Sequence, residues 1–145
     1  MSETVNPVVL SLLVCDTVSR DLVTRKDSVM GVFSMITSAE LPVMLPSAAV
    51  FFQITDVHNV CEFEIRITDV SGEREPVFSS GPVRCSSPSP LDVITGTVGI
   101  RNLAFAHSGE YRVQFWSQSA ILSEARFVVK AQPAEPREFG GFDRF

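Results

Sequence analysis

Hydrophobic and polar residues alternate along two adjacent runs in the C-terminal part of the chain. The apolar positions of the first run are Tyr111, Val113 and Phe115. After a polar turn, the apolar positions of the second run are Ile121, Ala125, Phe127 and Val129. Because successive side chains of a strand point to opposite faces, this period of two predicts a hairpin with one face in a core.

Shorter runs of the same kind precede this hairpin. Residues 48–55 and 61–67 alternate most regularly, which predicts half-buried strands. Residues 8–18 and 28–36 are apolar on both sides, so we expect strands that are covered on both faces or lie in an interface. Gly31 interrupts the second of these and predicts a bulge or a close backbone approach.

The spacing of these runs predicts the fold class. No window shows the periodicity of an amphipathic helix, and turns rich in Gly, Pro and Ser separate the runs. About seven or eight such strands favour an all-β chain, a two-sheet antiparallel β-sandwich. We expect an N-terminal tail at residues 1–7, one sandwich domain at 8–131, and a flexible C-terminal tail at 132–145.

Length and charge narrow the class of protein. The chain has 145 residues, 45% of them hydrophobic, which is enough for one core. Its net charge of -5 argues against nucleic acid and against an anionic membrane surface as partners. We find no signal peptide and no apolar stretch near the roughly 20 residues of a membrane span, so we expect a cytoplasmic protein.

The residues with reactive side chains predict no active site. Cys15, Cys61 and Cys85 are odd in number and form no CxxC pair, so we expect free thiols in a reducing compartment and no zinc site. His58 and His107 both fall in predicted turns, too few for a metal centre that needs about three or four ligands. A GxSxG motif is absent as well. We therefore expect no catalytic residue, metal or cofactor.

The turn before the first run carries a structural signal. His107 to Tyr111 is a small-residue turn with Gly109 that ends on a tyrosine, and this is similar to the tyrosine corner of immunoglobulin-like domains. The resemblance implies that the Tyr111 hydroxyl bonds back to the turn backbone. Val113 stands where an antibody domain has its second cysteine, and Trp116 follows on the same strand, so only the architecture carries over.

A resemblance to one family covers most of the chain. The chain resembles a bacterial family of uncharacterised, immunoglobulin-like domains whose members read roughly CD…D…GK.SLIGIF…LP…GEY. Arg25 stands where that family often has Gly. The matching residues are Cys15-Asp16, Asp21, Lys26, Val29-Met30-Gly31-Val32-Phe33, Leu45-Pro46 and Gly109-Glu110-Tyr111. The resemblance implies a sandwich fold and a bacterial, cytosolic origin, and it implies no activity.

Several large apolar residues fall opposite the predicted core. Large exposed apolar patches mark interfaces, and soluble homo-oligomers are common, so these residues predict self-association. The alternative is that the chain's own loops cover them. The residues are Phe51, Trp116, Leu122 and Val128.

Two further segments are candidates for partner contacts. The charged segment 16–27 is interpreted as a partner-binding loop or as a solvated connector with weak ion pairs. Its candidate residues are Asp16, Arg20, Asp21, Arg25 and Lys26. The C-terminal tail spaces Phe139, Phe142 and Phe145 three apart, as anchors that dock either on this chain or on a neighbouring subunit or partner.

The leading hypothesis is a non-enzymatic binding or assembly module that contacts proteins and self-associates. One alternative is a small-ligand-binding or enzymatic domain with a pocket at one end of the sandwich. Another is a structural subunit of a larger particle.

Overall fold

The computed structural model describes residues 5–70 and 75–131, and these form strands and turns without any helix. The all-β prediction is confirmed, but the described residues hold eleven strands instead of seven or eight. The additional strands are short: the predicted runs 8–18 and 28–36 are each divided in two, and Val83–Ser87 falls outside every predicted run. The strands are β1 (Val8–Cys15), β2 (Thr17–Arg20), β3 (Asp27–Met30), β4 (Met35–Ser38), β5 (Val43–Thr55), β6 (Asn59–Asp69), β7 (Phe78–Ser79), β8 (Val83–Ser87), β9 (Ile94–Phe105), β10 (Gly109–Ser117) and β11 (Ala120–Ala131).

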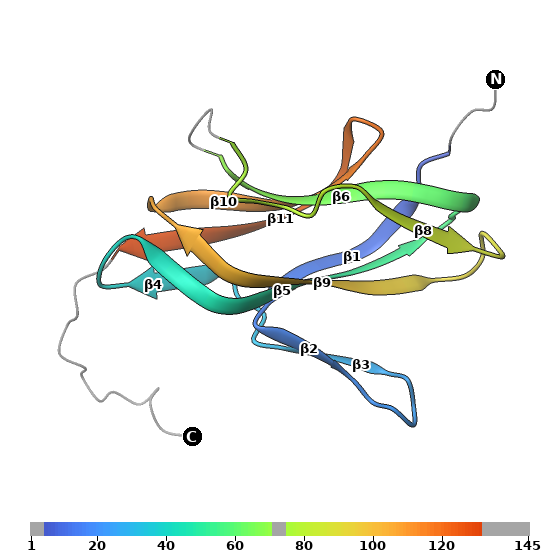
Figure 1. Cartoon of the computed structure of the whole chain (residues 1–145), viewed down its shortest axis with the longest axis horizontal. Helices are drawn as coiled ribbons and strands as arrows, with labels where there is room; N and C mark the ends of the chain where they lie inside the picture. Colours follow the sequence, from blue (N-terminus) through green and yellow to red (C-terminus); the bar gives the residue numbers. More distant parts are fainter. Residues whose placement is uncertain (1–4, 71–74, 132–145) are drawn as a thin grey trace.

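Most strands belong to two sheets that lie one over the other (Figure 1). The smaller sheet has the order β1-β5-β9, and both of its pairings are antiparallel. The larger has the order β4-β11-β10-β6-β7, with β8 also pairing with β6. Its pairings are antiparallel except that of β4, which runs parallel to β11. The β2–β3 hairpin forms a separate two-stranded sheet below the smaller one.

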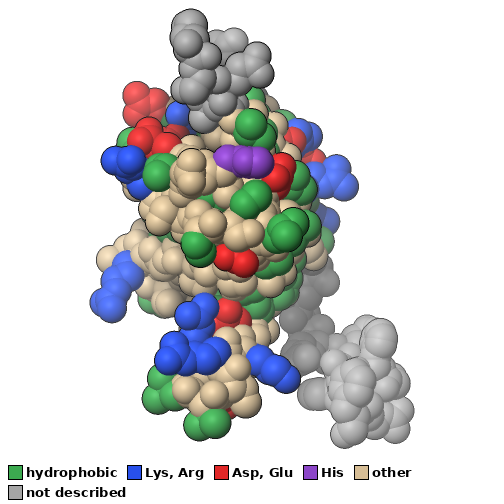
Figure 2. Space-filling view, turned by 90° about the vertical axis from the view of Figure 1, so that its right-hand side faces the viewer, with side chains coloured by type: hydrophobic (Ala, Val, Ile, Leu, Met, Phe, Trp, Pro, Cys, Tyr) green, Lys and Arg blue, Asp and Glu red, His purple; other side chains and the backbone are tan. Residues whose placement is uncertain are grey.

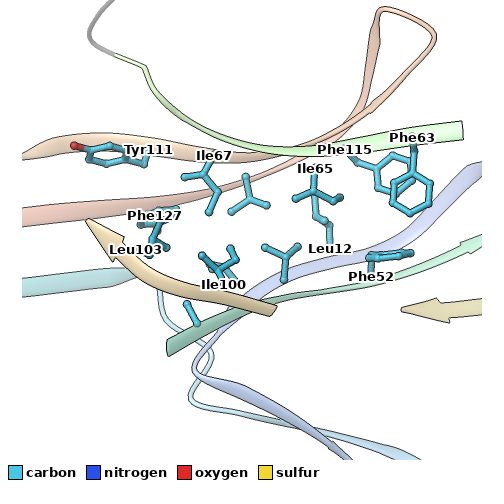
Figure 3. Packing of buried hydrophobic residues seen from close by; sticks show 14 of the residues in the cluster. Leu12, Phe52, Phe63, Ile65, Ile67, Ile100, Leu103, Tyr111, Phe115 and Phe127 are labelled. Carbon is cyan, nitrogen blue, oxygen red and sulfur yellow. The ribbon is translucent and has the colours of Figure 1, made fainter. Parts of the chain in front are cut away.

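The core fills the space between the smaller sheet β1-β5-β9 and the larger sheet β4-β11-β10-β6-β7 (Figure 3). The inner faces of residues 48–55 and 61–67 are those that the alternation predicts, because the core cluster contains Val50, Phe52 and Ile54 from the first and Cys61, Phe63, Ile65 and Ile67 from the second. Phe52, Phe63 and Phe115 pack together at one end, and the rings of the last two are stacked with centroids 4.7 Å apart. Aromatic rings of this size supply a large share of the buried apolar area.

The predicted tyrosine hydrogen bond is present. The Tyr111 hydroxyl donates to the backbone carbonyl of His107 at 2.6 Å, and only 1% of Tyr111 is exposed. Its ring packs between Phe105 and Phe127. Gly109 has φ +140°, a conformation that favours glycine, so the turn before β10 uses the residue type that its backbone requires.

Two predicted interface residues are not on an open outer face. Phe51 points away from the core but is only 8% exposed, because β2 contacts β5 on that side. Leu122 packs against the core, whereas Ile121, predicted to be buried, is 41% exposed. The cause is a bulge: the register shifts between Phe115 and Trp116, and the extra residue on β11 exchanges the two faces.

Candidate functional site

The β2–β3 hairpin, here called the arm (residues 16–31), is the most distinctive surface feature of the chain. It projects away from the two packed sheets (Figure 1). Its four antiparallel residue pairs run from Thr17 opposite Met30 to Arg20 opposite Asp27. The sequence places the arm's charged residues in a loop, and the structure shows that the segment is instead a strand, a turn and a second strand.

The base of the arm is tied to the end of β1. The backbone N–H of Asp16 lies 3.1 Å from the carbonyls of both Met30 and Gly31. Gly31 has φ +70°, and a Cβ there would lie 2.2 Å from Oδ2 of Asp16. The close backbone approach predicted at Gly31 is therefore confirmed, and glycine is the residue that fits.

The tip of the arm, residues 21–26, is held by hydrogen bonds within itself. The Asp21 carboxylate accepts from the backbone N–H groups of Val23 at 2.8 Å and Thr24 at 2.9 Å. These bonds lower the pKa of Asp21 from its ordinary value because they stabilise the charged form, and the bond from Thr24 has the largest effect. The Asp21 N–H donates to Lys26 and the Arg25 N–H to Asp21, both at 2.9 Å. Arg25 has φ +62°, in the left-handed region that favours glycine.

Two apolar residues stand at the end of this turn. Leu22 is 89% exposed and Val23 is 91% exposed. Figure 2 shows hydrophobic side chains at the end of the arm with Lys and Arg side chains beside them. Isolated exposed apolar residues are normal on protein surfaces. Here two adjacent ones stand on an ordered projection, and no other part of the described chain covers them, so they form a candidate contact point for a partner.

The charged residues of the arm divide into two groups. Arg20 forms a bidentate ion pair with Asp27, in which its Nε and Nη2 atoms lie 2.9 Å and 3.2 Å from the two carboxylate oxygens. This pair joins opposite residues of the two strands of the arm. The ion pair raises the pKa of Arg20 and lowers that of Asp27. Within the described residues Arg25 and Lys26 have no ion-pair partner, and they leave positive charge next to the apolar tip. The predicted partner residues are thus brought together on one projection.

A groove of about 410 Å³ separates the arm from the outer face of β9. The arm side is lined by Val18, Ser19, Arg20 and Asp27, and the β9 side by residues 95–97. The groove contains mostly small and uncharged side chains, so it offers space beside the arm rather than a group that performs chemistry.

The outer face of the larger sheet is polar. Arg112 pairs with Glu110 at 3.2 Å and with Glu124 at 3.0 Å, and Arg126 also pairs with Glu110. The Gln114 amide continues this network by donating to Glu124 at 2.8 Å. Exposed ion pairs of this kind contribute little stability individually, but they leave this part of the face without a large apolar patch.

Trp116 lies at the edge of that network, facing outward as predicted but half-buried. The guanidinium of Arg66, which pairs with Glu64, lies 4.4 Å from the centre of the Trp116 ring. Both residues line an open hollow of about 390 Å³ with Glu62 and Pro82. The Arg66 side chain already occupies one side of the ring, which leaves less apolar surface for a partner than the sequence suggests.

The other predicted interface residues are dispersed. Val128 is half-buried beside β4, with which its strand pairs. Phe139, Phe142 and Phe145 lie outside the described residues. Sequence reasoning missed Leu22 and Val23, although two adjacent apolar residues inside a charged segment were a visible signal.

The structure also brings two cysteines together. Cys61 on β6 is directly opposite Cys85 on β8, and both are free thiols. Burial, and secondly the neighbouring Cys85, raise the pKa of Cys61 to about 12. A thiol with so high a pKa is a poor nucleophile at neutral pH. Among the described residues, no group of three or more His, Cys, Asp or Glu side chains is placed to hold a metal ion.

Residues 5–70 and 75–131 contain no helix with the length and apolarity needed to cross a membrane.

No curated protein matches the chain. The solved structures that match the chain include a β-glucosidase from Listeria innocua in complex with glucose, with TM-score 0.47 and 14% identity over 82% of this chain. Another is a β-glucosidase from Kluyveromyces marxianus, with TM-score 0.42 and 14% identity over 74% of this chain. This chain corresponds to only 16% of either enzyme's chain.

One family model covers nearly all the strands described above, from residue 10 to residue 130. The resemblance to an uncharacterised family is thereby confirmed. The chain belongs to a family of unknown function (DUF6941).

Proposed function

We propose that this protein is a non-enzymatic binding and assembly module of the bacterial cytosol, with the architecture of an immunoglobulin-like β-sandwich. Its arm docks into a partner protein through Leu22 and Val23. The sandwich is the rigid scaffold, and the arm is the recognition element that it presents, which is a common division of labour in proteins.

Three features support the sandwich architecture. The strand order separates β1, β5 and β9 from β6, β10 and β11. The parallel pairing of β4 with β11 lets the N-terminal segment contribute to both sheets. The Tyr111 hydroxyl bonds to a carbonyl four residues upstream, as in a tyrosine corner. The three free thiols, two of them adjacent, support a reducing compartment.

The observation that carries the docking proposal is the exposure of the two tip residues on an ordered turn. Leu22 and Val23 expose 89% and 91% of their surface, so a partner pocket would remove nearly all of it from water. Because Asp21 already fixes the turn, little conformational entropy is lost on docking. Arg25 and Lys26 beside the tip favour a partner pocket with an acidic rim.

The test compares capture by three forms of the full chain from the native host. They are the wild type, the double variant Leu22→Asp/Val23→Asp, and the control Met44→Asp/Val60→Asp, which adds the same charge at other exposed positions. Met44 and Val60 are 56% and 45% exposed. All three are first compared by thermal melting, because exposed substitutions should leave folding nearly unchanged.

The proposal predicts one protein that the wild type and the control retain and that the arm variant loses. The purified pair should then bind directly, with the arm variant weakened about tenfold or more, as expected for a central apolar contact. Identical captured proteins for all three forms would overturn the proposal. The arm variant could instead retain every captured protein but lose a binding to vesicles of neutral and anionic phospholipid that the wild type shows. That result would assign the arm to a membrane and would overturn the proposal as well.

A further inference from the structure

Strand β9 forms an open edge of the smaller sheet. Within the described residues it pairs with β5 along one side only, and no strand lies along its other side. The strand is 12 residues long, and the pairing with β5 is continuous from Ile94 to Arg101. It therefore presents a row of backbone N–H and C=O groups long enough to accept another strand.

Between Ile94 and Arg101, this edge lacks the features by which proteins usually block such pairing, and the irregular residue Asn102, with φ +54°, lies beyond that span. Protected edges are short, bulged, or carry lysine, proline or an inward-pointing charge. β9 contains no lysine or proline, and Arg101 is its only charged residue. The outward-facing side chains before Arg101 are Thr95 and Thr97, followed by Gly99, which has nothing within 4 Å of where a Cβ would be. Small, uncharged side chains let a second backbone come close.

We propose that the β9 edges of two copies of this chain pair antiparallel about a two-fold axis at Val98. The proposal rests on the proposed assembly function and names the surface that would mediate it. The two smaller sheets then become one continuous sheet across the dimer. Such an interface is isologous, meaning that the same residues meet on both copies, which is the commonest arrangement in homo-oligomers.

The register follows from the geometry of antiparallel pairs. Two residues that lie directly opposite each other in an antiparallel pair have their side chains on the same face of the sheet. The residue at the two-fold axis must therefore lie opposite its own copy, and not opposite the copy of its neighbour in the sequence. Val98 is the central residue of the segment 95–101, which lies within the continuous span. With the axis there, Thr97 lies opposite Gly99 of the second copy, and Arg101 lies opposite Thr95 of the second copy. No like charges oppose each other, whereas an axis at Arg101 would place two arginines face to face.

The surroundings of the edge add apolar surface that such pairing would cover. Leu91 and Val93, just before β9, are 88% and 53% exposed. Antiparallel pairing directs this segment toward residues 103–105 of the second copy. The arm lies over the outer face of β9, separated from residues 95–97 by the groove, and so flanks the pairing edge. Exposed apolar residues beside an unpaired edge are typical of an interface.

The second copy is favoured over an unrelated extended peptide because the pattern of the edge is complementary to itself. Charge substitutions can test this complementarity directly. In the variant Thr97→Lys/Gly99→Lys, two pairs of lysines oppose each other across the axis. In Thr97→Glu/Gly99→Lys, each glutamate opposes a lysine. Residue 99 has room for a side chain, so these changes leave the monomer fold intact.

The experiment is sedimentation velocity on the full chain from micromolar to millimolar concentration. We expect a concentration-dependent wild-type dimer, a dimer more than about tenfold weaker in the lysine–lysine variant, and recovery in the glutamate–lysine variant. Hydrogen exchange should show concentration-dependent protection confined to β9 amides. Thermal melting checks that all variants are folded.

Four outcomes would overturn the inference. One is a wild-type chain that is monomeric throughout, and another is failure of the glutamate–lysine variant to recover. A third is a dimer that Leu22→Asp/Val23→Asp dissociates while the lysine–lysine variant leaves it intact, because the arm would then mediate self-association. The last is a monomeric wild type whose β9 edge instead pairs with another host protein. The docking of the arm in a different partner is measured separately and survives the first, second and fourth of these results, whereas the third would make a second copy of this chain the partner of the arm.

Discussion

The chain contains two β-hairpins of opposite character, β10–β11 and the arm. In the first, alternate residues of both strands enter the core, and Tyr111, Val113 and Phe127 are each at most 1% exposed. In the arm no residue belongs to the core cluster, and the two residues at the tip are among the most exposed of the described chain. Both hairpins are antiparallel strand pairs, but only β10–β11 has an apolar face that is buried in the core.

This difference separates two sources of order. The β10–β11 hairpin is held by apolar burial, which is non-directional and large. The arm is held by local polar contacts, namely the Arg20–Asp27 pair, the Asp21 carboxylate and the backbone bonds at its base. Local contacts keep a projection ordered at low stability, which is typical of elements that bind partners. Substitutions in the two hairpins should therefore affect different properties.

The largest effect is expected at Tyr111. Tyr111→Ala should lower the free energy of unfolding by roughly 3–5 kcal/mol, because it leaves a cavity between aromatic rings. Tyr111→Phe should lower it by about 1 kcal/mol through loss of the bond to His107. Leu22→Ala in the arm is the matched control and should change it by less than about 0.5 kcal/mol. Denaturant melts measure all three, and equal losses for Tyr111→Ala and Leu22→Ala would remove the distinction between the hairpins.

An intermediate effect is expected at the base of the arm. Gly31→Ala places a Cβ 2.2 Å from Oδ2 of Asp16 at φ +70°. Left-handed backbone alone costs an ordinary residue roughly 1–2 kcal/mol. Gly81 is the control, because its φ of +68° is similar but nothing lies within 4 Å of the added Cβ.

Hydrogen exchange should distinguish these two glycine variants. Both lose stability through the backbone term, but only Gly31→Ala should also increase exchange throughout residues 17–30. If Gly81→Ala loosens the arm to the same extent, the contact with Asp16 is not what positions it.

The alternation in the sequence was sufficient to predict the all-β class and most of the core. It succeeds for Cys61, Phe63 and Ile65 because a strand with one wet face must alternate, whatever lies around it. The same rule fails at Leu122, because one inserted residue on β11 inverts the pattern and leaves no mark in the hydrophobicity.

Other features depend on tertiary contacts that periodicity does not encode. The alternation of the sequence places Phe51 on the side of β5 that faces away from the core. It does not indicate that β2 contacts β5 on this side and buries Phe51. The charges of residues 16–27 predict a solvated segment, and the sequence does not reveal that Arg20 and Asp27 face each other across a hairpin. Cys61 and Cys85 are neighbours because β8 pairs with β6, and periodicity does not indicate which strands pair.

The smallest effect is expected from acid at the tip of the arm. Hydrogen bonds from the Thr24 and Val23 N–H groups lower the pKa of Asp21 below its ordinary value of 3.8. A lowered folded pKa means that the bonds stabilise the turn above the unfolded pKa and are lost as the pH falls through the folded one. We expect the carboxyl to titrate below 3.8 by NMR, and the protection of the Val23 and Thr24 amides to fall through the same pH range.

The outcome for the rest of the molecule sharpens the comparison between the hairpins. Because Asp21 is solvent-exposed and distant from the core, β10 amides should keep their protection while the tip loses its own. Asp21→Asn is the matched variant: it retains an acceptor oxygen but does not titrate, so its tip protection should not change across this range. A carboxyl that titrates at or above 3.8, with tip amides unprotected at neutral pH, would mean that the turn is not preformed. Leu22 and Val23 would then have to be ordered by the partner itself, at a loss of affinity.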